Sequence, residues 1–336
     1  MSQHKILPIQ TADWQQLQAQ SVRSPEQLLQ RLQLPASMLT EVIQASETFS
    51  LRVPEPYLQR IEAGNPNDPL LRQILPLGEE LHTTEGFSAD PVGDAASRNL
   101  PGLLHKYHGR VLLITTGACG IHCRYCFRRH YPYQDDKLNE EHWQGILTYL
   151  REEPEITEVI LSGGDPLTLS DQRLQKQLQD LSDIPHLQRL RIHSRQAIVL
   201  PQRVTEALLQ MLSSSRLQAV LVVHVNHANE LDDEVRAAMQ QLRQAGVTLL
   251  NQSVLLRGVN DDADSLSKLS ESLFESGILP YYLHQLDRVA GAAHFEVDEQ
   301  QALSLIKVLR RRLPGYLIPK LVREHSGADY KLPLEG

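Results

Sequence analysis

Six times between residues 111 and 313, the sequence passes from a short apolar run into a longer amphipathic stretch. The apolar runs are 111–116 (VLLITT), 158–163 (EVILSG), 190–194 (LRIHS), 219–225 (AVLVVHV), 247–256 (VTLLNQSVLL) and 279–286 (LPYYLHQL). The stretches with helical periodicity follow at about 138–152, 171–182, 202–214, 231–245, 262–276 and 298–313. Strands that are apolar along most of their length are buried on both faces. The alternation therefore predicts an α/β protein with a parallel sheet covered by helices.

Right-handed crossovers between consecutive strands would curl such a sheet into a full or partial (β/α) barrel, and we expect a partial (β/α)6 barrel. A doubly wound open sheet is the alternative. In both folds ligands bind at the carboxyl ends of the strands. The most unusual polar motifs of this sequence directly follow predicted strands, which supports the positions of those strands.

The first hundred residues predict short helices with no recognisable chemistry. Ser24 is a candidate N-cap whose capping box is completed by Gln27, and Gly64 is a plausible helix end. Pro76 interrupts a further helical stretch. The Gly-, Asp- and Ser-rich segment 85–99 predicts a connector.

Bulk composition narrows the class of protein without identifying a function. The chain has 336 residues, 41% of them hydrophobic, and its formal net charge of −8 argues against a general nucleic-acid-binding protein. It contains no run of 18 apolar residues, so we expect no membrane span. The N-terminal stretch has no basic start followed by an apolar block, so we do not expect secretion. Three clustered cysteines cannot form a disulfide framework and fit a reducing cytoplasm.

The only cysteines of the chain, Cys119, Cys123 and Cys126, stand within eight positions directly after the first predicted strand. Thiolates in C-x3-C-x2-C spacing suit an iron–sulfur cluster, in which three cysteines hold three corners of a cubane and leave one iron open. A zinc ion with His122 or His130 as fourth ligand is the alternative. Three unrelated buried cysteines would be an unusual coincidence, because the rest of the chain has none.

The sequence LSGGDPL (161–167) ends the second predicted strand. Gly163 and Gly164 allow the backbone to approach a ligand closely. Together with Ser162 and Asp165 they form a candidate binding turn. The alternative is an ordinary strand-to-helix turn in which Asp165 caps the helix.

With Tyr125 just before the last cysteine, the cysteine motif and the SGGD turn resemble those of the radical S-adenosylmethionine (SAM) superfamily. The resemblance implies a barrel of that type with a [4Fe–4S] cluster on the three cysteines. Its open iron would chelate the amino and carboxylate groups of SAM. The resemblance also implies that the turn at 162–165 contacts the methionine part of SAM.

Longer stretches resemble the lysine 2,3-aminomutase family within that superfamily, and the likeness runs from Tyr107 to Lys331. The matching stretches are YHGRVLLITTGACGIHCRYCFRRH, SGGDPL, HVNHANE, NQSVLLRGVND and YYLHQLDRVAGAAHF. The family uses pyridoxal 5′-phosphate (PLP) together with SAM and moves an amino group from C2 to C3 of an amino acid. The resemblance implies an isomerase that converts L-α-lysine to β-lysine. The chain is most similar to short bacterial members that supply (R)-β-lysine for modification of elongation factor P.

The resemblance also implies roles for residues that no local pattern would single out. Lys331 stands where the family has the lysine that binds PLP as an imine. Arg110 and Tyr107 match positions beside PLP, and His224 and Gln252 match contacts to the nucleoside of SAM. On local sequence alone these residues would be interpreted as solvated or structural.

The same resemblance implies a binding site for the amino-acid substrate. Arg128 matches the arginine that clamps the substrate carboxylate as a bidentate pair. Asp287 and Glu324 match the two carboxylates that hold the distal ammonium. Glu324 stands where lysine-specific members usually have aspartate, so its charge should reach farther into the pocket. Two carboxylates in this part of the substrate site favour a substrate with a cationic side chain and disfavour glutamate as the substrate.

Partners and further cofactors follow from the resemblance as well. It implies free lysine as substrate and an electron donor such as flavodoxin or ferredoxin, with no nucleic-acid or membrane partner. Longer members bind a structural zinc through C-terminal cysteines, and because no cysteine follows Cys126 we expect no zinc. The alternatives are an aminomutase for another amino acid, a PLP-independent radical SAM enzyme and a non-enzymatic zinc-binding module. The expected division is an N-terminal helical extension (1–100), the barrel core (101–315) and a C-terminal segment carrying the PLP lysine (316–336).

Overall fold

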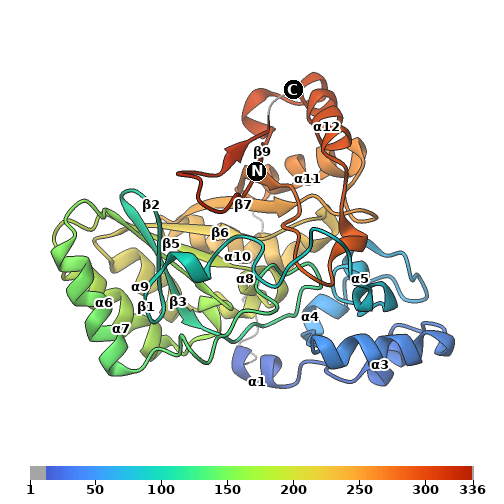
Figure 1. Cartoon of the computed structure of the whole chain (residues 1–336), viewed down its shortest axis with the longest axis horizontal. Coiled ribbons are helices and arrows are strands. Elements are labelled where there is room, and N and C mark those ends of the chain that lie inside the picture. The colour runs from blue at the N-terminus through green and yellow to red at the C-terminus, as the bar shows by residue number, and fades with distance from the viewer. Residues whose placement is uncertain (1–12, 335–336) are drawn as a thin grey trace, which may run out of the picture.

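The computed structural model describes residues 13–334, and within that range the strands form one curved ten-stranded sheet (Figure 1). The strands are β1 (Arg98–Leu100), β2 (Leu103–Tyr107), β3 (Arg110–Thr116), β4 (Glu158–Gly163), β5 (Arg189–Ser194), β6 (Gln218–Val223), β7 (Thr248–Val254), β8 (Leu279–His284), β9 (Lys320–Arg323) and β10 (Leu332–Pro333). They lie side by side in chain order. Strands β3 to β9 pair in parallel, whereas β1 and β2 at one edge and β10 at the other pair antiparallel.

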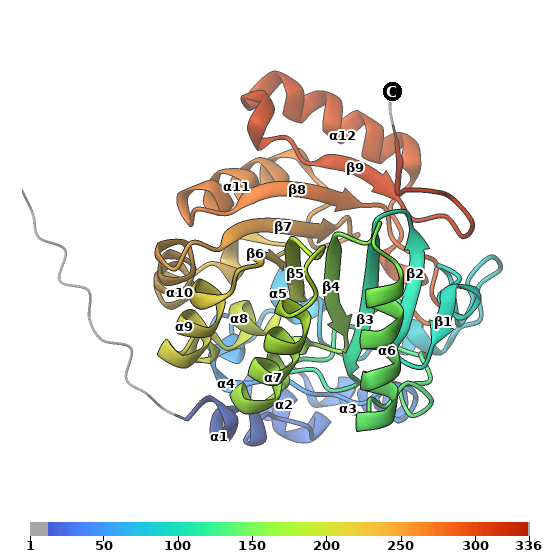
Figure 2. The same cartoon turned by 90° about the vertical axis from the view of Figure 1, so that its left-hand side faces the viewer.

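The longer helices cover the outer face of the parallel strands. They are α6 (Glu140–Glu152), α7 (Asp171–Ser182), α9 (Glu206–Ser214), α10 (Asp233–Gln244), α11 (Ala263–Glu275) and α12 (Glu299–Arg312). Figure 2 shows α6, α7 and α9 in front of the strands, with α10, α11 and α12 continuing around the outside. Each helix buries one apolar face. Ile146 and Leu150 of α6, for example, share a core with Val111 and Leu161 of the sheet.

The six predicted strand–helix units are confirmed, each strand within a few residues of its expected position. The strand order runs in sequence without turning back, so the described residues form a partial barrel and not a doubly wound sheet. The short strand β9 adds a parallel strand that the sequence pattern did not predict. The hairpin of β1 and β2 was also not predicted, and β1 occupies the end of the segment 85–99 that we expected to be a connector.

The N-terminal part consists of short helices, as expected. They are α1 (Trp14–Ala19), α2 (Pro25–Arg31), α3 (Leu39–Thr48), α4 (Glu55–Leu58) and α5 (Pro69–Arg72), with the 3₁₀ turns η1 (Ala36–Met38), η2 (Gly78–Leu81) and η3 (Ala95–Ser97). The predicted N-cap is confirmed, because the Ser24 hydroxyl accepts a hydrogen bond from the Gln27 amide at 3.2 Å. The predicted break at Pro76 is also confirmed, since α5 and η2 lie on either side of it.

The helix that was expected to run to Gly64 ends earlier. Helix α4 stops at Leu58, because the Ile61 amide donates to the Leu58 carbonyl three residues back, as in a turn. Gly64 has a positive φ of 76°, and its amide donates to the Leu32 carbonyl at 2.7 Å. The glycine is therefore a turn residue that ties α4 back to the end of α2.

The N-terminal helices pack around a second core that reaches the cysteine-bearing loop. Leu28, Tyr57 and Leu71 belong to this core, which also includes Ile121 and contacts the half-buried Cys123. The N-terminal region therefore braces the segment that carries the predicted cluster ligands. No helix in residues 13–334 is both long and apolar enough to cross a bilayer.

Candidate active site

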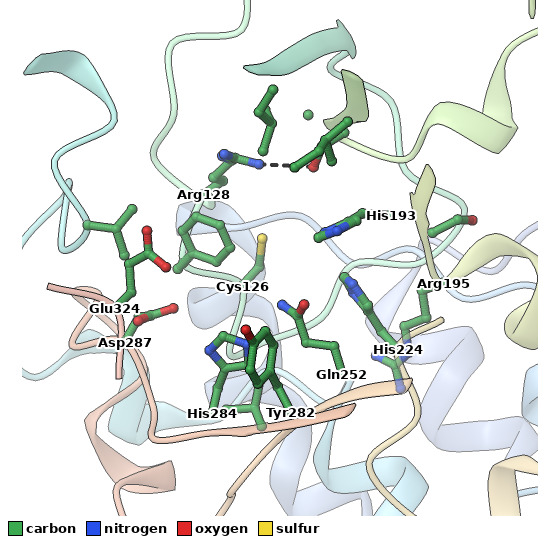
Figure 3. Close-up of a pocket in the computed structure, with 18 of the residues that line it drawn as sticks. Cys126, Arg128, His193, Arg195, His224, Gln252, Tyr282, His284, Asp287 and Glu324 are labelled. Atoms are coloured by element: carbon green, nitrogen blue, oxygen red, sulfur yellow. Dashed lines mark hydrogen bonds between the residues drawn. The ribbon is translucent and has the colours of Figure 1, made fainter. Parts of the chain in front are cut away.

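A cavity of about 540 Å³ lies at the carboxyl ends of the parallel strands, and every residue nominated for the cluster, SAM, PLP or the substrate lines it (Figure 3), whereas the alternative zinc ligands His122 and His130 do not. The nominated residues in the lining are Tyr107, Arg110, Cys119, Cys123, Cys126, Arg128, Ser162, Gly163, Gly164, Asp165, His224, Gln252, Asp287, Glu324 and Lys331. Figure 3 shows Asp287 and Glu324 together on one side of the cavity and His224 with Arg195 on the other. We call the first side the carboxylate end, and the region of the three cysteines and Arg195 the cysteine end.

The three cysteines lie in the loop between β3 and α6 and form no disulfide. Burial raises the pKa of Cys126 to about 11 and that of Cys119 well above its usual range, and neighbouring thiols raise both further. No group of three or more His, Cys, Asp or Glu side chains in residues 13–334 is arranged around a single ion. In a cubane, however, each thiolate binds a different iron. Thiolates gathered here would repel one another, and the cationic core of a [4Fe–4S] cluster would offset that repulsion, so the donor set fits such a cluster.

Arg124, between the second and third cysteines, anchors the loop to the N-terminal region. Its guanidinium is fully buried and donates to Glu80 through Nε at 2.8 Å and to the Phe49 carbonyl through Nη1 at 2.6 Å. Glu80 also accepts from Nη2 of Arg129 at 2.7 Å. Removing one partner of a buried ion pair is strongly destabilising, so this carboxylate holds the loop firmly. Nothing in the sequence pattern marks Glu80 for that role.

The SGGD turn packs directly against the cysteine loop. Gly163 has a φ of 113°, and a Cβ at Gly164 would come within 2.3 Å of the Ala118 carbonyl oxygen, so only glycine fits there. The Asp165 carboxylate is fully engaged within the fold. It accepts hydrogen bonds from the Leu167, Arg195 and Gln196 amides at 2.7 to 3.0 Å and from the Ser194 hydroxyl at 2.7 Å. Asp165 therefore caps the turn and joins β4 to β5, which is the alternative role considered for it.

Arg128 is buried, and two contacts fix its guanidinium. Nε donates to Asp94 at 2.7 Å, and Nη1 donates to the Ser162 hydroxyl at 3.2 Å. Asp94 also pairs with Nζ of Lys106 at 2.7 Å. The remaining nitrogen, Nη2, makes no hydrogen bond to any residue between 13 and 334, so the side chain can bind an anionic ligand in the cavity. Sequence reasoning missed Asp94, because the segment around it has the composition of a connector.

Glu324 links two distant parts of the chain at the carboxylate end. Its Oε1 accepts a hydrogen bond from the Tyr107 hydroxyl at 2.7 Å, and its Oε2 pairs with Nζ of Lys331. Burial alone would raise the pKa of Glu324, but Lys331 and Tyr107 outweigh it and hold that pKa below its usual range. Tyr107 is on β2 and Glu324 follows β9, and Figure 2 shows these two strands approaching each other. The contact therefore joins, through side chains, two strands that each lie next to an edge of the curved sheet.

Asp287 lies beside Glu324 but is not paired. Its Oδ1 is buried and has no hydrogen-bond partner among the described residues. Burial raises the pKa of Asp287 to about 7, and the nearby charge of Glu324 raises it while Lys331 lowers it. A carboxyl group that is costly to ionise here would gain most from a cationic ligand.

Arg110 differs from the other arginines of the cavity lining, since its guanidinium forms no hydrogen bond or ion pair within residues 13–334. It lies 4.8 Å from the ring centroid of Tyr107, in a cation–π contact. An arginine without a carboxylate partner in a partly apolar cavity suits a phosphate group. With Lys331 in the same lining, these residues fit PLP by the chemistry of their side chains.

Histidine side chains form much of the middle of the cavity (Figure 3). Nε2 of His193, His224 and His284 is in each case buried with no partner in the described part of the chain. Burial lowers the pKa of His224 to about 4, so its ring is neutral at neutral pH and can donate or accept a hydrogen bond. Gln252 lies between His224 and Tyr282. His193, in the predicted strand 190–194, and His284 were not nominated from the sequence, although strand-end positions mark both.

The chain is similar to known proteins both over one domain and over nearly its whole length. The Radical SAM superfamily model matches residues 113–269. The L-lysine 2,3-aminomutase of Escherichia coli is 50% identical over 324 residues, which cover 96% of this chain and 94% of that protein. The chain belongs to the L-lysine 2,3-aminomutase family. The Haemophilus influenzae family member is 47% identical, covering 95% and 94% of the two chains, and that of Clostridium subterminale is 36% identical, covering 96% and 77%.

Membership in the L-lysine 2,3-aminomutase family makes the protein an isomerase. Its radical SAM domain implies a [4Fe–4S] cluster and SAM as cofactors. The matched residues contain the three cysteines, the SGGD turn, His224 and Gln252. They do not contain Asp287, Glu324 or Lys331, so the carboxylate end is built largely outside the superfamily domain.

Proposed function

We propose that this protein converts L-α-lysine to β-lysine by moving the amino group from C2 to C3, with a [4Fe–4S] cluster, SAM and PLP as cofactors. The observation that carries the proposal is that three thiols, Lys331 and two carboxylates meet in one cavity. It is supported by relatives of nearly the same length that are named L-lysine 2,3-aminomutase.

Each cofactor has a matching set of side chains in the cavity. Cys119, Cys123 and Cys126 would ligate the cluster, and the backbone of the SGGD turn with His224 and Gln252 would bind SAM. Lys331 would hold PLP covalently, with Arg110 on its phosphate and Tyr107 beside it. When bound, the cluster and SAM supply a carbon radical that abstracts hydrogen, and PLP carries the migrating amino group.

The two ends of the substrate meet opposite charges. Arg128, held by Asp94 and Ser162, would bind the α-carboxylate through its free Nη2. Asp287 and Glu324 would bind the distal ammonium. In the structure Glu324 forms an ion pair with Lys331. If Lys331 holds PLP, its nitrogen would no longer be the free ammonium that pairs with Glu324. A glutamate substrate would instead place a third carboxylate there, which disfavours it.

Part of the cavity wall is apolar. The cavity wall includes the buried side chains of Ile160, Val199 and Leu286, which offer no hydrogen-bond partner to water. Exclusion of water and stray hydrogen donors is what a radical rearrangement requires of its site.

Further parts of the proposal concern the cellular setting. We propose a cytoplasmic enzyme that releases (R)-β-lysine for modification of elongation factor P. Flavodoxin or ferredoxin would be its electron donor, and it would have no structural zinc and no nucleic-acid or membrane partner. The N-terminal helical extension, the core and the C-terminal segment would act as one unit around the cavity.

The test is anaerobic reconstitution with iron, sulfide and PLP, followed by incubation with L-lysine, SAM and dithionite and chiral analysis of the product. The expected result is a cluster spectrum, bound PLP and (R)-β-lysine. Turnover without bound PLP would identify a PLP-independent radical SAM enzyme. If another amino acid were converted and lysine were not, the protein would be an aminomutase for that amino acid. One zinc per chain with no iron or sulfide would instead favour a metal-binding module.

A further inference from the structure

Arg195 is a buried cation of the cysteine end that the proposed function does not use. It directly follows β5 and precedes the short helix α8 (Gln196–Val199). Only 5% of its surface is exposed, and it lines the cavity. Its Nη1 donates a hydrogen bond to Sγ of Cys123 at 2.7 Å. Arg195 therefore contacts one of the proposed cluster ligands directly.

The other face of the guanidinium is fixed by a buried polar network. Nη2 donates to Glu230 at 2.8 Å and to the Gln73 side-chain oxygen at 2.7 Å. Glu230 in turn accepts from the Asn226 amide at 2.9 Å, and it is fully buried. The Arg195 backbone amide donates to Asp165 at 2.7 Å. The orientation of Nη1 toward the thiol is thus set by partners on several other elements.

Aromatic rings close the remaining sides of this arginine. Its guanidinium carbon lies 5.4 Å from the ring centroid of Tyr57 and 5.7 Å from that of Tyr125. The rings shield these sides of the guanidinium from water, so its charge interactions are stronger than those of an exposed arginine.

We propose that Arg195 is a positioning residue that donates a hydrogen bond to the Cys123 thiolate in the cluster-loaded enzyme and makes the cluster easier to reduce. This inference rests on the proposed ligation of the cluster by Cys123. One electron from dithionite, or from a low-potential flavin or iron–sulfur protein, adds one negative charge to the cluster. A fixed guanidinium beside a ligand sulfur stabilises that added charge, as hydrogen bonds to cluster sulfurs do in general.

The experiment is a redox titration of the reconstituted holoenzyme without SAM, with reduced cluster measured by electron paramagnetic resonance. Arg195→Gln removes the charge and should lower the midpoint potential. We expect at least a tenfold fall in the reduction equilibrium, which for one electron is about 59 mV. Iron and sulfide contents are measured in parallel, so that potentials are compared only between fully loaded samples.

Arg203→Gln is the matched control, because Arg203 is also a buried arginine, pairs with Asp171 at 2.8 Å and does not line the cavity. This variant should leave the potential unchanged even if it lowers thermal stability. Arg195→Lys keeps the charge but loses the planar fork that spans Cys123 and Glu230, so it should give a smaller fall. It also serves as the deciding variant if Arg195→Gln binds no cluster.

Equal potentials in wild type and in a loaded Arg195 variant would overturn the inference. A difference that arises only after SAM is added would also overturn it, because that result assigns Arg195 to SAM. A wild-type protein that takes up no iron and sulfide would refute the proposed function, a failure that the same measurements distinguish from the other two.

Discussion

The two ends of the cavity are built in opposite ways. At the cysteine end, the three ligands come from eight consecutive positions of one loop. At the carboxylate end, Tyr107 and Glu324 are 217 positions apart, and Asp287 and Lys331 come from two further segments. Chemistry confined to one loop can be identified from residue spacing. Chemistry assembled from sheet edges becomes visible only when the fold brings the residues together.

The charges at the two ends differ as well. At the carboxylate end, Glu324 already pairs with Lys331, whereas Oδ1 of Asp287 has no partner among the described residues; Asp94 nearby contacts both Arg128 and Lys106. The cysteine end has three half-buried thiols and the guanidinium of Arg195, which is already shared with Glu230. A cation that binds Glu324 at the carboxylate end must therefore replace an existing ion-pair partner. A cluster that binds at the cysteine end must instead supply positive charge to the thiolates. The predictions that follow test this difference.

The largest effect is expected from Cys123→Ala, which removes one cluster ligand. The protein should bind no iron–sulfur cluster, remain colourless after reconstitution and show no detectable turnover, because no other cysteine can replace the ligand. Iron analysis and absorbance spectra check this result. His130→Ala is the control, since this exposed residue lies near the same loop and would matter only if zinc were bound. Full activity of Cys123→Ala would exclude a role of the cysteine-bound cluster in the reaction.

Lys331→Ala should be nearly as severe but selective for PLP. We expect normal iron content, no PLP retained after borohydride reduction and a rate lower by about a thousandfold, or about 4 kcal/mol. Mass spectrometry of the reduced protein locates the label. Lys320→Ala, at another lysine of the cavity lining, should keep the label. PLP retained in the Lys331 variant would place the attachment at a different lysine.

Asp287→Asn should raise KM for lysine by about a hundredfold, because one partner of a buried charge pair is lost. The cluster and PLP should load normally, which separates this change from the two above. The measurement is steady-state KM for lysine, compared with binding of an analogue that lacks the distal ammonium. The variant should lose its preference for lysine over the analogue. An unchanged preference would exclude Asp287 from substrate binding.

The pH dependence should report the same carboxyl group. Burial raises the pKa of Asp287 to about 7, so the group is largely neutral below that pH and charged above it. An ammonium binds the charged form, and KM for lysine should therefore fall as pH rises from about 6 to about 8. The surrounding charges are Lys331, Glu324, Lys106 and Asp94. The fall should be absent in Asp287→Asn, and a fall of equal size in that variant would assign it to another group.

The smallest effect is expected from Tyr107→Phe. It removes the hydrogen bond to Glu324 while keeping the ring under Arg110, and should cost about 1 kcal/mol, or about fivefold in KM. The turnover number should change little. Tyr330→Phe is the control, since Tyr330 is 57% exposed, also lines the cavity and has no hydrogen bond within the described residues. Equal effects of the two variants would mean that the Tyr107 hydroxyl has no specific role.

Much of the barrel could be predicted from the sequence, because its strands are long, apolar and followed by amphipathic helices. Strand β9 was missed for a physical reason. Lys320–Arg323 contains only two apolar residues between two charged ones, and its conformation depends on pairing with β8. Helix α4 was predicted too long. A glycine shows where a helix can end, but it does not show where the backbone hydrogen bonds shorten from four residues to three.

The candidate site divides in the same way. The cysteines and the SGGD turn were predicted from spacing and strand position, and the remaining nominated residues came from family resemblance. Asp94 and Arg195 were missed, because an aspartate in a connector and an arginine after a strand are usually solvated. Their importance depends on partners such as Arg128 and Glu230, which no local pattern connects to them.

The side-chain contact between β2 and β9 has a consequence for substrate binding. Backbone hydrogen bonds join all neighbouring strands of the sheet, whereas β2 and β9 are joined through side chains, by the Tyr107–Glu324 hydrogen bond and the Lys106–Glu324 contact. This side-chain contact can break without the loss of any backbone hydrogen bond between strands. Lysine bound at Glu324 would meet the same carboxylate that accepts the Tyr107 hydrogen bond, so substrate binding and the contact between β2 and β9 would influence each other.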